Sequence, residues 1–358
     1  MFPTNAQAFE VLLLQAADDG RDAALFGGAS YRVRDTALPF FIGEKFPEIY
    51  LEFPLAGEPF LDVTLLYGEL KEGTHIDSAL AEGCEEILSF HARERAKDES
   101  VGFGFEIDCS NPAPSAAGIH FQPRSRTDLV APFCEAAGNP EKASLYLAQN
   151  ARMPNDWPLA FFGMFRGRAD SPLRVCGYLG KDERDACMAD PEHLGRALAQ
   201  AGFAAFDDTM LAQAARVLEL TPADADFQFD VFADGSLGDM FAIDVRFNQM
   251  SSDDVCASFA EGEGAALMAQ LREWGIADER VSHVADMSFT RGVKLLADDG
   301  SIALYGFSLV PGWLKVRWRG GVLQPAKMYM KASAGPVVKG GQIEDEQIKD
   351  GPEEHERA

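Results

Sequence analysis

Pairs of short apolar strands separated by helical stretches constrain this chain more than any other feature of its sequence. The clearest pair is 226–232 with 240–247, joined by the hairpin-type turn Ala233-Asp234-Gly235-Ser236. Further strands are expected at 49–55, 59–67, 102–109, 118–122, 159–166, 173–179, 302–309, 313–319 and 326–331. Helical periodicity predicts helices over 5–17, 76–97, 140–150, 193–201, 208–220 and 254–274. The chain therefore repeats a unit of two strands followed by a helical connection about five times.

Five such units supply about ten strands, which is long for an open sheet. Closing the sheet removes its unpaired edges, and helices outside it would bury one strand face while the other lines an interior. Rossmann and TIM folds need single strands that alternate with helices. We therefore predict an α+β protein with a closed antiparallel β-barrel of about ten strands surrounded by helices; an α+β sandwich is the alternative. Residues 1–334 should form one domain, and the Gly-rich, charged segment 335–358 a disordered tail.

The charge balance limits the partners of the chain. It has 32 Lys and Arg against 57 Asp and Glu, a net charge of −25 that repels nucleic acid and anionic lipid. Its six cysteines include no C-x-x-C pair, which favours reduced thiols over disulfides or a zinc site. No signal peptide and no apolar run long enough to span a bilayer are found. These features predict a cytoplasmic protein without a nucleic-acid or membrane partner.

Basic and aromatic residues share one face of several predicted strands. Arg174 lies on the same face as Tyr178, and Lys327 on the same face as Tyr329, because strand side chains alternate with a period of two. An aromatic ring stabilises a nearby cation by roughly 0.5–2 kcal/mol. Packing is the simpler explanation for any one of these rings. Their recurrence beside basic residues favours a lumen that holds an anion, and we expect a diphosphate.

Lys315 and Arg317 are neighbouring cations on one face of the predicted strand 313–319. Two like charges at this spacing repel each other unless an anion or a carboxylate lies between them. Asp230 and Asp244, one from each strand of the preceding pair, are the obvious internal partners. An internal ion-pair network and an anion-binding site are therefore both open interpretations.

Two short motifs and the predicted barrel resemble the ABBA (αββα, PT-barrel) aromatic prenyltransferases over about residues 45–332. One motif is Lys327-Met328-Tyr329, since that family places cations and tyrosines together on later strands. The other is Gly57-Glu58-Pro59-Phe60-Leu61-Asp62, which is similar to the family's Gly-x-Pro-hydrophobic-Glu element. The carboxylate here, Asp62, comes one position later, which places it on the opposite strand face unless a bulge intervenes.

The resemblance implies transfer of a prenyl group from an allylic diphosphate to an aromatic acceptor, either a small molecule or a peptide side chain. It implies roles for eight residues: diphosphate binding by Arg174, Lys315, Arg317 and Lys327, shielding of the carbocation by Tyr178 and Tyr329, and proton acceptance by Asp62 or Glu106. No metal ligand is predicted, because the Asp-Asp pairs lack the spacing of a magnesium-binding D-D-x-x-D box. No cofactor is required, and Mg²⁺ is optional.

Other interpretations remain open at this point. Asp108, Asp230 and His120 are further candidates for the base, although a single strand histidine is more often structural. A function of a different class is a non-catalytic barrel that binds a peptide or an anionic ligand as a partner in a biosynthetic pathway. In that case Asp230 and Asp244 would neutralise the lumen cations, and no pocket would remain.

Overall fold

The computed structural model describes residues 3–109, 116–154, 157–166, 171–222, 224–247, 250–296 and 302–337. In this part of the chain twelve strands form one antiparallel sheet: β1 (Glu48–Pro54), β2 (Asp62–Tyr67), β3 (Gly102–Ile107), β4 (Gly118–Gln122), β5 (Leu159–Phe165), β6 (Leu173–Leu179), β7 (Ala225–Val231), β8 (Leu237–Arg246), β9 (Phe289–Leu296), β10 (Ile302–Arg319), β11 (Val322–Leu323) and β12 (Lys327–Pro336). Ten of them form a ring in the order β10-β12-β1-β2-β3-β4-β5-β6-β7-β8. The ring closes because β10 pairs with both β12 and β8. The predicted closed barrel is confirmed.

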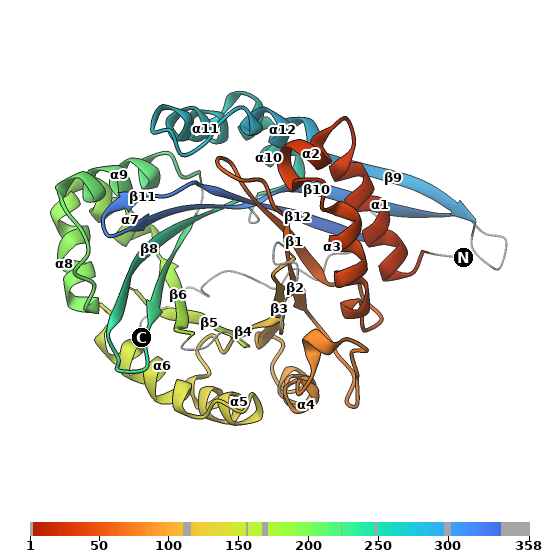
Figure 1. Cartoon of the computed structure of the whole chain (residues 1–358), viewed down its shortest axis with the longest axis horizontal. Coiled ribbons are helices and arrows are strands. Elements are labelled where there is room, and N and C mark those ends of the chain that lie inside the picture. The colour runs from red at the N-terminus through yellow and green to blue at the C-terminus, as the bar shows by residue number, and fades with distance from the viewer. Residues whose placement is uncertain are drawn as a thin grey trace, which may run out of the picture.

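Helices cover the outside of this ring (Figure 1). In the described residues they are α1 (Asn5–Ala17), α2 (Arg21–Phe26), α3 (Ser30–Ala37), α4 (Glu85–Arg95), α5 (Val130–Ala136), α6 (Glu141–Arg152), α7 (Lys181–Ala189), α8 (Pro191–Ala201), α9 (Asp208–Glu219), α10 (Ser252–Glu261), α11 (Glu263–Glu273) and α12 (Arg280–Met287). Short 3₁₀ turns lie at Leu38–Phe40, Ala79–Ala81 and Thr127–Leu129. The chain travels once around the barrel, and most helices contact strands that follow them: α2 contacts β1, α3 contacts β2, α4 contacts β3, α6 contacts β6 and α9 contacts β8.

The two faces of the barrel strands differ in chemistry. Outward side chains are apolar and pack on the helices; Phe121 of β4, for example, stacks on Phe133 of α5 with ring centroids 3.9 Å apart and planes 6° apart. Burying a side chain of this kind contributes about 1.5–3 kcal/mol. Inward side chains are often charged or polar yet buried, among them Asp226, Gln228 and Asp244. The main core therefore lies between strands and helices, and the polar groups gather in the lumen.

Two predicted helices differ from the observed ones for identifiable reasons. The helix predicted over 76–97 begins only at Glu85, because Gly83 adopts a left-handed backbone with φ of +72°. The helix predicted over 254–274 is divided into α10 and α11 at Gly262, whose backbone is extended. A Cβ atom at Gly262 would lie 2.9 Å from the Ser258 Cα, so only glycine fits this break.

The strands near the C-terminal end also differ from the prediction. The strands predicted at 302–309 and 313–319 are one strand, β10, with a register shift between Pro311 and Trp313. Strand β9 pairs with β10 outside the ring and was not predicted. Strand β12 continues to Pro336, paired with Tyr305, two residues past the predicted domain boundary. Residues 338–358 of the predicted tail lie outside the described residues.

The described helices include none that is both long enough and apolar enough to traverse a bilayer.

Candidate functional site

The lumen is lined by alternate residues of the ring strands. The turns within strand pairs lie at one end of the barrel, here called the hairpin end, and the helical connections start from the other. Register places Arg174 opposite Asp230 and Lys315 opposite Asp244, so these four residues share the inner face. Local alternation predicted this shared face, and the pairing of distant strands brings its members together.

A cavity of about 70 Å³ lies in the lumen, and every strand of the ten-strand ring contributes to its lining. One water needs a cavity of at least roughly 10–15 Å³, so this cavity admits water. The lining includes five predicted site residues, Glu106, Arg174, Tyr178, Lys315 and Tyr329. Within the part of the chain that the structure describes, the other three (Asp62, Arg317 and Lys327) are not among the lining residues.

Two of the predicted diphosphate ligands form ion pairs. Arg174 Nε lies 3.2 Å from Asp230 Oδ1, and Lys315 Nζ lies 3.6 Å from Asp244 Oδ2. Burial alone would lower the pKa of Arg174, but Asp230 and Glu106 raise it above its ordinary value. For Asp244 burial dominates, and its pKa is raised although Lys315 opposes the shift. An internal ion-pair network, one of the two open interpretations, is therefore present at these positions.

The other two cations lie nearer the hairpin end and differ from each other. Lys327 of β12 pairs with Glu52 of β1. For Arg317, no carboxylate of the described residues lies within ion-pair distance, and its Nε donates to the Pro325 carbonyl oxygen at 3.4 Å. Burial lowers the pKa of Arg317; Tyr329 and Glu52 oppose this shift, and the charge of Arg174 adds to it. Arg317 is therefore a half-buried cation that a bound anion would stabilise.

Glu106 is the better placed of the two predicted bases. Its Oε2 lies 2.8 Å from His120 Nε2, and both residues line the cavity. Burial alone would raise the pKa of Glu106, but the hydrogen bond and charge of His120, together with Arg174 and Lys315, hold it below its usual value. The carboxylate is thus ionised at neutral pH.

The expectation that Asp62 lies on the strand face opposite the lumen is wrong, because Asp62 has the same parity on β2 as Thr64, which lines the cavity. Asp62 lies opposite Glu52 in a β1–β2 pairing without a register shift, and Glu52 contacts the inward-facing Lys327. Alternation therefore places Asp62 on the lumen face at the hairpin end. Of the two predicted bases, Glu106 lines the cavity, whereas Asp62 is not among the described residues that line it.

The two predicted carbocation shields lie in the lumen with cations over their rings. Arg124 donates a hydrogen bond to the Tyr178 hydroxyl, and the guanidinium of Arg246 lies 5.3 Å from the Tyr178 ring centroid. Lys315 Nζ lies 5.1 Å from the Tyr329 ring centroid. Burial raises the pKa of Tyr329 well above its ordinary value, so its hydroxyl stays protonated. Both rings offer a face to a positive charge.

Several lumen residues were missed from the sequence. Glu52 pairs with Lys327, and Asp226 lies 3.6 Å from Arg246 with both side chains almost fully buried. Gln228 accepts a hydrogen bond from the lumen lysine of β10 at 2.9 Å. The segment 226–230 could have predicted Asp226 and Gln228, since it reads polar, apolar, polar, apolar, polar.

Comparison with known proteins supports the fold. No family model and no curated protein matches this chain. AnaPT from Neosartorya fischeri has a TM-score of 0.50 at 10% identity, covering 93% of this chain and 94% of that chain. NotF in complex with brevianamide F and DMSPP scores 0.49 at 10% identity, covering 95% of this chain and 97% of that chain. The 5-dimethylallyltryptophan synthase from Streptomyces coelicolor scores 0.48 at 12% identity, with 92% and 97% covered. The likeness to AnaPT confirms the αββα barrel expected from the sequence, as a statement about fold.

Proposed function

We propose that the chain binds an allylic diphosphate in its lumen and transfers the prenyl group to an aromatic acceptor, either a small molecule or a peptide side chain. The observation that carries this proposal is Arg317, a half-buried cation with no carboxylate within ion-pair distance in the described residues. The positive charge of Arg174 lowers the pKa of Arg317, and Lys315 lies two residues away from Arg317 on the same strand face. A diphosphate would neutralise this cluster, and guanidinium groups suit its oxygens because they bind them in a bidentate manner.

The lumen residues suit each step of the transfer. As the C–O bond of the allylic diphosphate breaks, Arg174 and Arg317 stabilise the charge that develops on the departing diphosphate. The carbocation lies against the Tyr178 and Tyr329 rings, which stabilise it and exclude water. A ring carbon of the acceptor then bonds to the prenyl carbon, and Glu106 takes the proton that this carbon releases. No step requires a cofactor; Mg²⁺ is optional, because the cations do most of the neutralising.

Protonation of Asp244 would allow Lys315 to exchange its carboxylate partner for the substrate. A diphosphate that binds Lys315 must displace the Asp244 carboxylate, 3.6 Å away. Burial raises the pKa of Asp244, so this carboxyl is easier to protonate than an exposed one. Proton uptake by Asp244 would free the ammonium for the phosphate oxygens. Substrate binding is then coupled to uptake of one proton.

A second candidate is a non-catalytic barrel that binds a peptide or an anionic ligand. It is favoured by the carboxylate partners of Arg174, Lys315 and Lys327. It is also favoured by the cavity of about 70 Å³, which is smaller than a prenyl diphosphate and an aromatic acceptor together. Under this function the ion pairs persist and the lumen is a structural core.

A transfer assay separates the two candidates. The chain is incubated with dimethylallyl or geranyl diphosphate and with tryptophan, indole or peptides that contain Trp or Tyr, and mass spectrometry detects the added prenyl group. Glu106→Gln should abolish transfer but still bind an unreactive thiolodiphosphate, whereas Arg317→Gln should lose binding. Arg272→Gln, at an exposed position on α11, is the matched control and should behave as the wild type. Binding without transfer to any acceptor would favour the second candidate, and the absence of both would overturn the proposal.

A further inference from the structure

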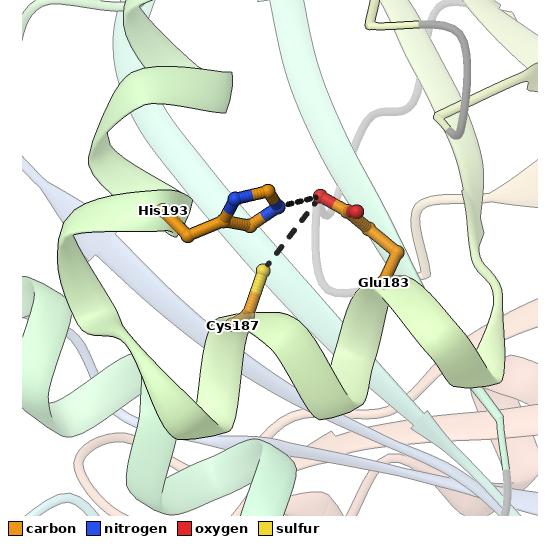
Figure 2. Close-up of side chains that lie close together, drawn as sticks. All are labelled: Glu183, Cys187 and His193. Carbon is orange, nitrogen blue, oxygen red and sulfur yellow. Dashed lines mark hydrogen bonds and ion pairs between the residues drawn. The ribbon is translucent and has the colours of Figure 1, made fainter.

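Three side chains with metal-binding atoms meet on the outer helices, away from the lumen. Glu183 and Cys187 lie one turn apart on α7, and His193 lies in the first turn of α8. Figure 2 shows the three side chains directed toward one another across the α7–α8 turn. One ligand atom from each residue lies within 4.8 Å of the other two. We infer that Glu183, Cys187 and His193 bind a zinc-class divalent metal ion.

The distances suit a tetrahedral ion after small side-chain movements. His193 Nε2 lies 2.8 Å from Glu183 Oε1, and Cys187 Sγ lies 3.9 Å from the same oxygen. With zinc bonds of about 2.0–2.3 Å, tetrahedral geometry places nitrogen and oxygen about 3.4 Å apart and sulfur and oxygen about 3.5 Å apart. Each of these two distances must therefore change by roughly half an ångström, and the Cys187 sulfur and the His193 ring nitrogen lie within 4.8 Å of each other. Rotation of the side chains supplies such a shift without moving the helices.

The donor set selects the class of metal. One sulfur, one imidazole nitrogen and one carboxylate oxygen suit Zn²⁺ and similar ions, whereas Mg²⁺ and Ca²⁺ prefer oxygen ligands alone. Cys187 is fully buried, and the His193 side chain is 35% exposed, so the ion can enter past the imidazole. Water can then occupy the fourth position. When the ion binds, a metal–sulfur bond forms and the thiol proton leaves to solvent.

Hydrogen bonds orient the ligand side chains before a metal ion binds. Trp157 Nε1 donates a hydrogen bond to Glu183 Oε1 at 2.7 Å, which orients the carboxylate as an outer partner does in metal sites. The hydrogen bond between Glu183 and His193 keeps the two groups together before the ion arrives. Because the ligands come from two helices, a bound ion would link α7 to α8 and stabilise the folded chain.

Metal titration tests the inference without any use of prenyl-transfer activity. Untagged wild-type protein is stripped with a chelator, desalted and titrated with Co²⁺ alone, and Zn²⁺ is then added. We expect one equivalent of Co²⁺ to give a thiolate-to-cobalt absorption band, which Zn²⁺ abolishes, and Zn²⁺ to raise the melting temperature. Cys187→Ser should lose the band, and His193→Gln should weaken binding at least tenfold.

Cys256→Ser on α10 is the control for adventitious thiol binding, because Cys256 is the partly exposed cysteine among the six. This variant should titrate like the wild type. If Cys187→Ser does not fold, His193→Gln still decides the matter, since its side chain is partly exposed and its loss leaves the core intact. A wild-type protein without a stoichiometric band would overturn the inference. The same holds if His193→Gln binds the metal as tightly as the wild type.

Discussion

Replacement of Lys315 by methionine tests whether the lumen ion pairs stabilise the barrel. Methionine keeps most of the apolar stem and removes the charge. Lys315 Nζ lies 3.6 Å from Asp244 Oδ2, which at an effective dielectric constant of about 20 corresponds to an attraction of about 4.6 kcal/mol. Removing one partner of a buried pair costs about 3–5 kcal/mol. We expect the free energy of unfolding to fall by about 3 kcal/mol at neutral pH, the low end of that range, because Asp244 can take up a proton.

The pH dependence of this loss has a definite sign. Burial already raises the pKa of Asp244, and the loss of Lys315 removes a group that opposes the shift. A raised carboxyl pKa in the folded state means that stability falls as pH rises through it, so the deficit of Lys315→Met should shrink at mildly acidic pH. Urea unfolding followed by circular dichroism at both pH values measures this. Lys71→Met, at an exposed lysine paired with Glu44, should unfold like the wild type. Equal stability of Lys315→Met and wild type at both pH values would refute the reasoning.

Three further predictions concern packing and protonation. Gly177→Ala should lower the free energy of unfolding by about 1–3 kcal/mol, because the new Cβ would lie 2.4 Å from a phenylalanine ring and from a backbone oxygen. The control is Gly180→Ala, whose new Cβ meets nothing within 4 Å, and it should match the wild type in urea melts. The pKa of Glu106 is lowered in the folded state, so this carboxylate stabilises the fold above its unfolded pKa of about 4.3, and the stabilisation is lost at lower pH. The difference in free energy of unfolding between the wild type and Glu106→Gln should therefore become smaller on acidification. The affinity of the protein for the thiolodiphosphate should rise as the pH falls below neutral, because protonation of Asp244 frees the ammonium of Lys315. In Asp244→Asn the affinity should no longer depend on pH in this way, and titration at several pH values checks both results.

Local alternation predicted which of the basic and aromatic site residues share a strand face, whereas the expectation for Asp62 was wrong. Lys315 and Arg317 face the lumen together because their side chains are separated by one residue, a relation that any strand imposes. The ring itself followed from counting strand pairs, since about ten strands need closure. The shared inner face of Arg174 and Tyr178 was predictable in the same way.

Relations between distant segments were not predictable. Lys327 pairs with Glu52, 275 residues earlier, because β12 and β1 are neighbours in the closed ring. Asp230 pairs with Arg174, not with Lys315 or Arg317, because register places β7 against β6 at that point. Arg317 consequently lacks an ion-pair partner in the described residues, although it lies on the same strand face as Lys315 and alternation alone does not distinguish the two.

The most direct test is a calorimetric titration of the chain with dimethylallyl thiolodiphosphate, which binds as the diphosphate does but does not ionise. The account predicts that one equivalent binds, that Arg317→Gln weakens binding at least tenfold, and that Arg272→Gln leaves it unchanged. Absence of binding to the wild type, or equal affinity in Arg317→Gln, would contradict the claim that the lumen cations hold a diphosphate.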